Sequence, residues 1–227
     1  MTMLRSCLVA LLVAVVSWSA PARSQTEETS GKSSLGKELE GLAPGPRIAY
    51  LEFLLRSRAG DPEVLFQLGV AFQEDSKPDS ALFYYRKATE VAPNLSKAYV
   101  NMGVLLDDQR KPDEAIVMLE RAATINPNDL LAHAHAAYML LERGEHEAAW
   151  SHLSKALAID SLNPQPHFYL AIFFWESGMY REALTEWETV VRLAPGSYLA
   201  AKAEENITLL QQALTGSSDR GAVKIQR

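Results

Sequence analysis

A 34-residue repeat is the feature of this sequence that most restricts how the chain can fold. Four alanines recur at intervals of 34 residues: Ala81, Ala115, Ala149 and Ala183. The intervals define four copies that follow one another without insertion or deletion: 62–95, 96–129, 130–163 and 164–197. A period of this length is typical of solenoids, in which each copy must stack on its neighbours to bury its apolar face. The repeat therefore predicts an elongated stack rather than one central core.

Each copy is predicted to form two antiparallel helices. In the first copy, Leu65, Leu68 and Phe72 have the spacing of one helix face, and a second apolar face begins at Ala81. Pro78 lies between the two faces, where proline suits the first turn of the second helix. The third and fourth copies have a glycine at this turn, at which a helix can end in a left-handed conformation. These glycines are Gly144 and Gly178.

The order of residue types in each copy resembles that of tetratricopeptide repeats, whose pattern is large, Leu, small, aromatic, then Ala, aromatic, Ala and Pro. The first copy matches the pattern at Leu65, Leu68, Gly69, Phe72, Ala81, Tyr85, Ala88 and Pro93. The third copy departs from it at His133, Ala137 and Ser161, and the fourth departs at His167 and Ala171. The resemblance implies an all-α fold, a right-handed α-solenoid of helix pairs.

Both ends of the repeat array carry further apolar stripes. Residues 46–61 are predicted to form an N-terminal packing helix, equivalent to a lone second helix ahead of the first copy. Residues 198–214 are predicted to form a capping helix, because a solenoid needs its terminal apolar faces covered. Two polar segments, 23–45 and 215–227, are predicted to be a disordered linker and a disordered tail.

The first 22 residues have the order of a signal peptide. Arg5 precedes an apolar run from Cys7 to Val16, and Ala20 and Ala22 give a small-x-small cleavage site. The apolar run is shorter than the ~20 residues that cross a bilayer. We therefore expect export to the periplasm or the medium, with no stable membrane anchor after cleavage; an uncleaved N-terminal anchor is the alternative.

Charge and composition exclude several classes of function. The 22 Lys and Arg against 28 Asp and Glu give a net charge of −6, which argues against binding nucleic acid. A single cysteine, Cys7, leaves no disulfide framework or cysteine metal cage within one chain. The five histidines lack the spacing of a zinc site, and no nucleophile motif is present. We expect no catalytic residues, no cofactor and no metal.

The family resemblance implies that the first helix of each pair lines a concave groove that binds another protein. The positions equivalent to family groove positions define the groove set: Phe66, Val70, Val100, Asn101, Val104, Leu131, His135, Tyr138, Phe168, Tyr169, Ile172 and Trp175. Four carboxylates at the last groove position define an acidic edge: Glu74, Asp108, Glu142 and Glu176. Alternatively, the apolar residues of the groove set pack within the chain. The acidic edge would then serve only to keep the protein soluble.

The chemistry of the groove set favours a hydrophobic or basic partner segment. Some tetratricopeptide proteins hold a terminal carboxylate with Lys, Asn and Arg side chains, and those places here hold Phe66, Val70, Asn101, Leu131 and His135. Starting one copy later, the places hold Val100, Val104, His135, Gln165 and Tyr169. Neither set supplies two cations. We expect an exported adaptor in the assembly of an envelope complex; the alternative is a structural spacer or a self-associating subunit that uses its convex face or its ends.

Overall fold

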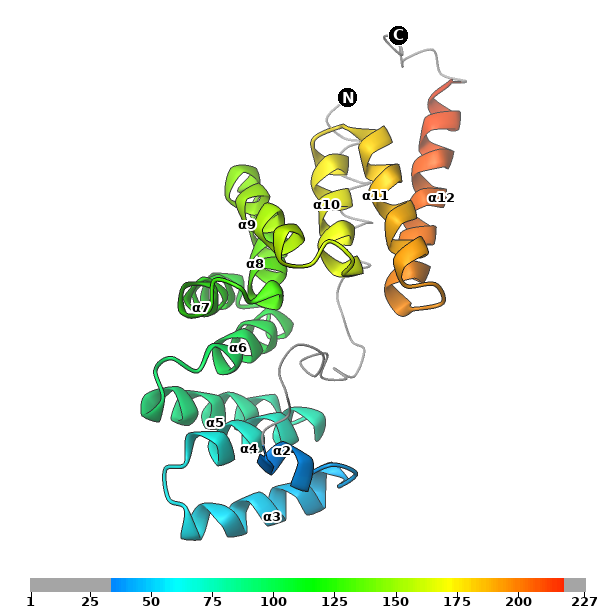
Figure 1. The fold of residues 1–227 in the computed structure, drawn as a ribbon. Helices are drawn as coiled ribbons and strands as arrows, with labels where there is room; N and C mark the ends of the chain where they lie inside the picture. The colour runs from blue at the N-terminus through cyan, green and yellow to red at the C-terminus, as the bar shows by residue number, and fades with distance from the viewer. Residues whose placement is uncertain (1–33, 219–227) are drawn as a thin grey trace. The chain divides into compact units, whose positions relative to one another are not determined.

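The computed structural model describes residues 34–218, which form helices and no strands (Figure 1). The helices of this range are α2 (Ser34–Glu38), α3 (Pro44–Ser57), α4 (Pro62–Glu74), α5 (Pro78–Val91), α6 (Ser96–Asp108), α7 (Pro112–Ile125), α8 (Leu130–Glu142), α9 (His146–Ile159), α10 (Pro164–Glu176), α11 (Tyr180–Leu193) and α12 (Tyr198–Ser218). The described chain divides into two compact units. We call residues 34–127 the N-terminal unit and residues 128–218 the C-terminal unit.

The helix pairs follow the 34-residue period, which confirms the predicted all-α fold. Each first helix has 13 residues and each second helix has 14. The N-terminal unit contains the pairs α4–α5 and α6–α7, and the C-terminal unit contains α8–α9 and α10–α11. Close approach within a pair depends on small residues, because a Cβ on Gly103 would lie 2.6 Å from Cγ of Leu119.

The turn between the helices of a pair has the same backbone in all four copies. The sequence predicts a left-handed residue only at Gly144 and Gly178, which have φ angles of 74° and 76°. The structure places Ser76 and Arg110 at the equivalent position, with φ angles of 56° and 61°. Pro78 and Pro112 therefore do not replace the left-handed turn but follow it by two residues.

The N-terminal end differs from the predicted linker. Disorder was expected over residues 23–45, yet residues 34–38 form α2, and α3 begins at Pro44 rather than at residue 46. Leu35 and Leu39 are buried together with Leu51 and Leu68, because the apolar side of α4 would otherwise face water. Residues 23–33 lie outside the described part of the chain. The range of α3 lies one period before that of α5, so α3 is in register with the second helices of the four copies.

The C-terminal end is closed by α12, which packs against α11. Its buried stripe includes the predicted Ala203 and Leu210, and α12 extends to Ser218, four residues into the segment that was predicted to be a disordered tail. Residues 219–227 lie outside the described range, as does the predicted signal peptide at residues 1–22. Within residues 34–218, no helix is long and apolar enough to cross a membrane.

Candidate functional site

In the N-terminal unit, the larger part of the groove set is buried within the unit. Phe66, Val100 and Asn101 are 4%, 4% and 9% exposed, and only Val70 and Val104 are partly exposed. The Asn101 amide donates to the hydroxyl of Tyr85 at 3.0 Å, and that hydroxyl donates to Gln73 Oε1 at 2.8 Å. These hydrogen bonds join α4, α5 and α6. Phe66 and Asn101 therefore pack within the chain, which is the alternative to ligand binding given above for these positions.

The N-terminal end of the acidic edge is neutralised by a residue that the sequence analysis did not single out. Arg47 on α3 forms an ion pair with Glu74 on α4, with Nη1 and Oε2 2.6 Å apart, and it also donates to the carbonyl of Leu42. The sequence does contain a signal for Arg47, which lies one period before the small residue Ala81. A guanidinium at a position that otherwise holds alanine must find an anionic partner when it is partly buried.

In the C-terminal unit, more of the groove set remains accessible. Five members are partly exposed: Leu131, His135, Tyr138, Ile172 and Trp175. Phe168 and Tyr169 lie beneath them and are 3% and 6% exposed. Both buried rings belong to the apolar core of the unit, against which Tyr138, Ile172 and Trp175 also pack. This unit therefore presents a partly exposed aromatic and aliphatic surface on α8 and α10, which we call the C-terminal groove surface.

Hydrogen bonds and ring contacts fix the side chains of this surface. The rings of Tyr138 and Tyr169 are stacked with centroids 5.1 Å apart, and the Tyr138 hydroxyl donates to Glu142 Oε1 at 2.7 Å. The Gln165 amide donates to the Tyr169 hydroxyl at 3.2 Å and lies 3.4 Å from Nε2 of His135. Burial lowers the pKa of His135, so its ring is neutral at pH 7 and supplies no cation for a carboxylate.

The acidic edge of this unit is less charged than the sequence suggests. Burial, and secondarily the negative charge of Glu142, raise the pKa of Glu176 to about 7. A carboxyl with this pKa is about half protonated at neutral pH. Nδ1 of His146 on α9 lies 3.8 Å from Oε2 of Glu176. Lowering the pH therefore removes negative charge at this end of the groove surface.

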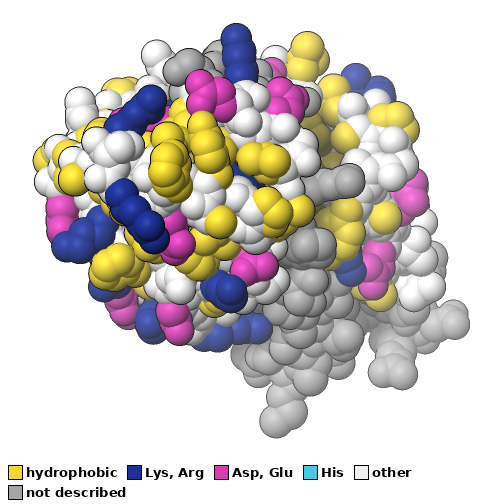
Figure 2. All heavy atoms as spheres, turned by 90° about the horizontal axis from the view of Figure 1, so that it is seen from below, with side chains coloured by type: hydrophobic (Ala, Val, Ile, Leu, Met, Phe, Trp, Pro, Cys, Tyr) yellow, Lys and Arg dark blue, Asp and Glu magenta, His cyan; other side chains and the backbone are white. Residues whose placement is uncertain are grey.

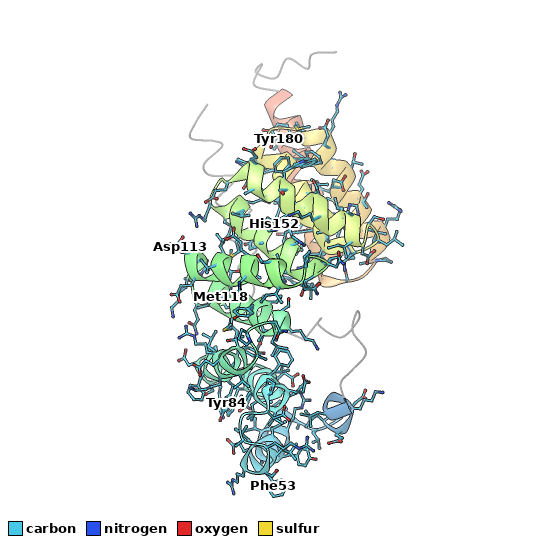
Figure 3. The ribbon with its side chains drawn as sticks, turned by 60° about the vertical axis from the view of Figure 1, so that its left-hand side comes forward. Phe53, Tyr84, Asp113, Met118, His152 and Tyr180 are labelled. Atoms are coloured by element: carbon cyan, nitrogen blue, oxygen red, sulfur yellow. The ribbon has the colours of Figure 1, made fainter. Side chains whose placement is uncertain are left out.

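The histidines at the large position of the third and fourth copies pair with their own second helices. Nδ1 of His133 lies 2.9 Å from Nδ1 of His152, a residue labelled on α9 in Figure 3. Nδ1 of His167 lies 2.6 Å from Oε2 of Glu186 on α11. Neither pair belongs to a metal centre, because no group of three or more His, Cys, Asp or Glu residues within 34–218 could hold a metal ion.

Exposed apolar side chains also occur away from the groove set. Trp150 on α9 is 47% exposed and contacts the ring of Phe173, with centroids 5.4 Å apart. In the N-terminal unit, Phe53 on α3 is 63% exposed and Phe83 on α5 is 54% exposed. On the face shown in Figure 2, hydrophobic side chains lie between Lys, Arg, Asp and Glu side chains. These residues were missed because amphipathic spacing alone does not distinguish them from solvent-exposed positions.

Comparisons with known proteins agree with the repeat pattern. Tetratricopeptide repeat models match residues 62–95 and 100–164. MamA (41-end) from Desulfovibrio magneticus RS-1 is 21% identical with a TM-score of 0.62, covering 71% of this chain and 92% of that chain. TTC0263, described as a thermophilic TPR protein in Thermus thermophilus, is 21% identical with a TM-score of 0.59, and the match covers 78% of this chain and 95% of TTC0263. YrrB, described as a TPR protein with an unusual peptide-binding site, is 16% identical with a TM-score of 0.58, and the match covers 77% of this chain and 100% of YrrB. No curated protein matches the chain. At these identities the structural likeness shows the fold.

Proposed function

Since residues 62–95 and 100–164 are tetratricopeptide repeats, a fold of protein–protein interaction scaffolds, we propose that this chain is an adaptor that binds a segment of a partner protein on its C-terminal groove surface. The observation that carries the proposal is the partial exposure of Tyr138, Ile172 and Trp175 over buried rings of the same unit. Partly exposed aromatic side chains are typical anchors of protein interfaces.

The chemistry of this surface supports a hydrophobic or basic segment as the ligand. His135 is neutral at pH 7, and two acidic side chains, Glu142 and the partly protonated Glu176, lie at the ends of α8 and α10. An acidic segment would meet carboxylates without a compensating cation on the groove surface, whereas a Lys or Arg side chain would complement Glu142.

We further propose that the protein is exported and acts in the assembly of an envelope complex. The order of Arg5, the apolar run and the Ala20–Ala22 site supports cleavage after Ala22. N-terminal sequencing of the native protein should find Arg23 as its first residue. A native protein that retains residues 1–22 would contradict cleavage and favour a membrane anchor.

The binding proposal is tested with an array of 12-residue peptides in three classes: apolar with Lys and Arg, apolar without charge, and acidic with a free carboxylate. We expect binding by the apolar and basic peptides. Trp175→Ala should weaken it about tenfold or more, with little dependence on salt, because burial of one aromatic ring contributes roughly 1.5–3 kcal/mol.

The matched control is Trp150→Ala, which removes an indole that is 47% exposed and lies outside the groove set. It should leave peptide affinity unchanged. Preference for the acidic class, or equal affinity of wild type and Trp175→Ala, would contradict groove binding. A mass that rises with protein concentration, without peptide binding, would instead favour the self-associating subunit.

A further inference from the structure

The core of the C-terminal unit contains a polar group that the fold leaves unsatisfied. Trp187 on α11 is 1% exposed, and its indole Nε1–H is buried without a hydrogen-bond partner among the described residues. A buried donor that loses its hydrogen bond to water and gains none in the protein is destabilising. Such a group in a folded protein calls for an explanation, and an unidentified ligand is one.

The repeat register shows why this donor has no partner. Tyr85 occupies the equivalent position three periods earlier, and its hydroxyl is bonded to both Gln73 and Asn101. The residues three periods after those two partners are Trp175 and Ala203. An indole offers only a donor and an alanine side chain offers no polar atom. The fourth copy thus keeps a polar side chain in the core but lacks the polar partners of the first copy, where Gln73 accepts from Tyr85 and Asn101 donates to it.

The same register places Trp187 next to the C-terminal groove surface. Trp175, a partly exposed member of that surface, contacts Trp187, with ring centroids 6.2 Å apart. In the first copy, the hydrogen bonds of Tyr85 reach α4 and α6, the two helices that line the groove of the N-terminal unit. Trp175 is thus a partly exposed ring in direct contact with Trp187, and a bound segment that displaced it would come next to Trp187.

We propose that the Trp187 indole N–H donates a hydrogen bond to a backbone carbonyl of the bound segment, after Trp175 has moved aside. This inference rests on the proposed function, and it deepens that function by identifying the class of ligand atom and the residue that positions it. An extended peptide segment offers uncompensated carbonyl groups, whereas a segment that binds as a helix has used its own carbonyls within the helix. The ligand of the fourth copy is therefore an extended segment.

The test uses the full chain with ¹⁵N-labelled tryptophan, and the probe is N-acetyl-leucine methylamide, which carries one apolar side chain and two backbone carbonyls. The Trp187 indole resonance is assigned by its absence from Trp187→Phe, a variant that removes the N–H and keeps an aromatic ring. On titration we expect a saturable downfield shift of the Trp187 indole proton. Trp187→Phe should weaken binding about three- to tenfold, as expected for one neutral hydrogen bond. Trp150→Phe, the matched control, should not weaken it.

The possible outcomes separate this inference from the function on which it rests. If array peptides bind and Trp175 responds to the probe while the Trp187 resonance does not move, the groove function stands and the inference is wrong. If no array peptide binds, the proposed function is wrong, and the probe still decides whether Trp187 donates to a carbonyl. A trapped water in place of a ligand predicts that Trp187→Phe loses stability without losing affinity, and this result would also overturn the inference.

Discussion

At the scale of single residues, the left-handed turn residues seen in the structure predict how substitutions there change the free energy of unfolding. Arg110 adopts a φ of 61° at a position where the third copy has Gly144. A side chain in this conformation costs roughly 1 kcal/mol that glycine avoids. Arg110→Gly should therefore raise the free energy of unfolding by about 0.5–1 kcal/mol, and Gly144→Ala should lower it by a similar amount. Urea denaturation measures both; a stabilising Gly144→Ala would contradict the argument.

The His133–His152 pair predicts how stability depends on pH. Only one proton can lie between two Nδ1 atoms 2.9 Å apart, and burial, then His133 and Lys155, lower the pKa of His152 to about 4. The folded pKa lies below the unfolded value of about 6.5, so the unfolded chain binds more protons between these limits. The pair's contribution to the free energy of unfolding is fully present above pH 6.5. It decreases by about 1–3 kcal/mol as the pH falls towards 4.

The comparison of wild type with His152→Met isolates this effect, because methionine occupies the equivalent position in the second copy. The loss of stability between pH 7 and pH 5 should be smaller in the variant. The His167–Glu186 pair acts in the opposite direction: its hydrogen bond raises the pKa of His167, so its contribution grows as the pH falls. In His167→Gln, the free energy of unfolding should therefore fall more steeply than in the wild type as the pH is lowered. Parallel pH profiles for wild type and His152→Met would show that the imidazole pair does not control the dependence.

At the scale of elements, α12 is in register with the first helices of the copies, and no second helix follows it within residues 34–218. In the other copies, one face of the first helix packs on the second helix and carries large and small apolar residues. The equivalent positions of α12 are exposed and mostly polar: Ala201, Glu204, Glu205 and Thr208. A terminal repeat with a polar outer face is what a solenoid needs at its end.

Deletion of residues 198–218 should uncover the side of α11 that carries Trp187 and Val190, which are 1% and 0% exposed in the complete chain. We expect a lower melting temperature and aggregation, because an uncovered apolar face promotes association. Circular dichroism melting and light scattering measure the two effects. A deletion variant that melts as the full chain does would rule out the capping role.

At the scale of the whole molecule, a repeat array predicts local rather than global consequences of core substitutions, since each repeat contacts only its neighbours. Phe66→Ala removes a ring that is 4% exposed and should cost about 3–5 kcal/mol. Hydrogen exchange should rise in α4 to α6 and remain slow in α10 and α11. A uniform increase over residues 34–218 would show that the chain unfolds as one cooperative unit.

The sequence by itself determined the helix pairs of this protein, because the residue types that form them repeat every 34 positions. The alanines from Ala81 to Ala183 mark this period, and no contact with a distant part of the chain changes it. The bounds of α5, α7, α9 and α11 follow that period without exception. The sequence could not decide which members of the groove set are accessible, because Phe66 and Trp175 are both aromatic residues at groove positions. Phe66 contacts Tyr85 and Lys97 and is buried, as is Phe168 three periods later, whereas Trp175 occupies another position of the repeat and is partly exposed although it contacts Tyr180 and Trp187. The exposure of a side chain, its hydrogen bonds, the ion pair of Glu74 with Arg47 and the protonation of Glu176 all depend on what packs against each group, and only the tertiary structure specifies those contacts.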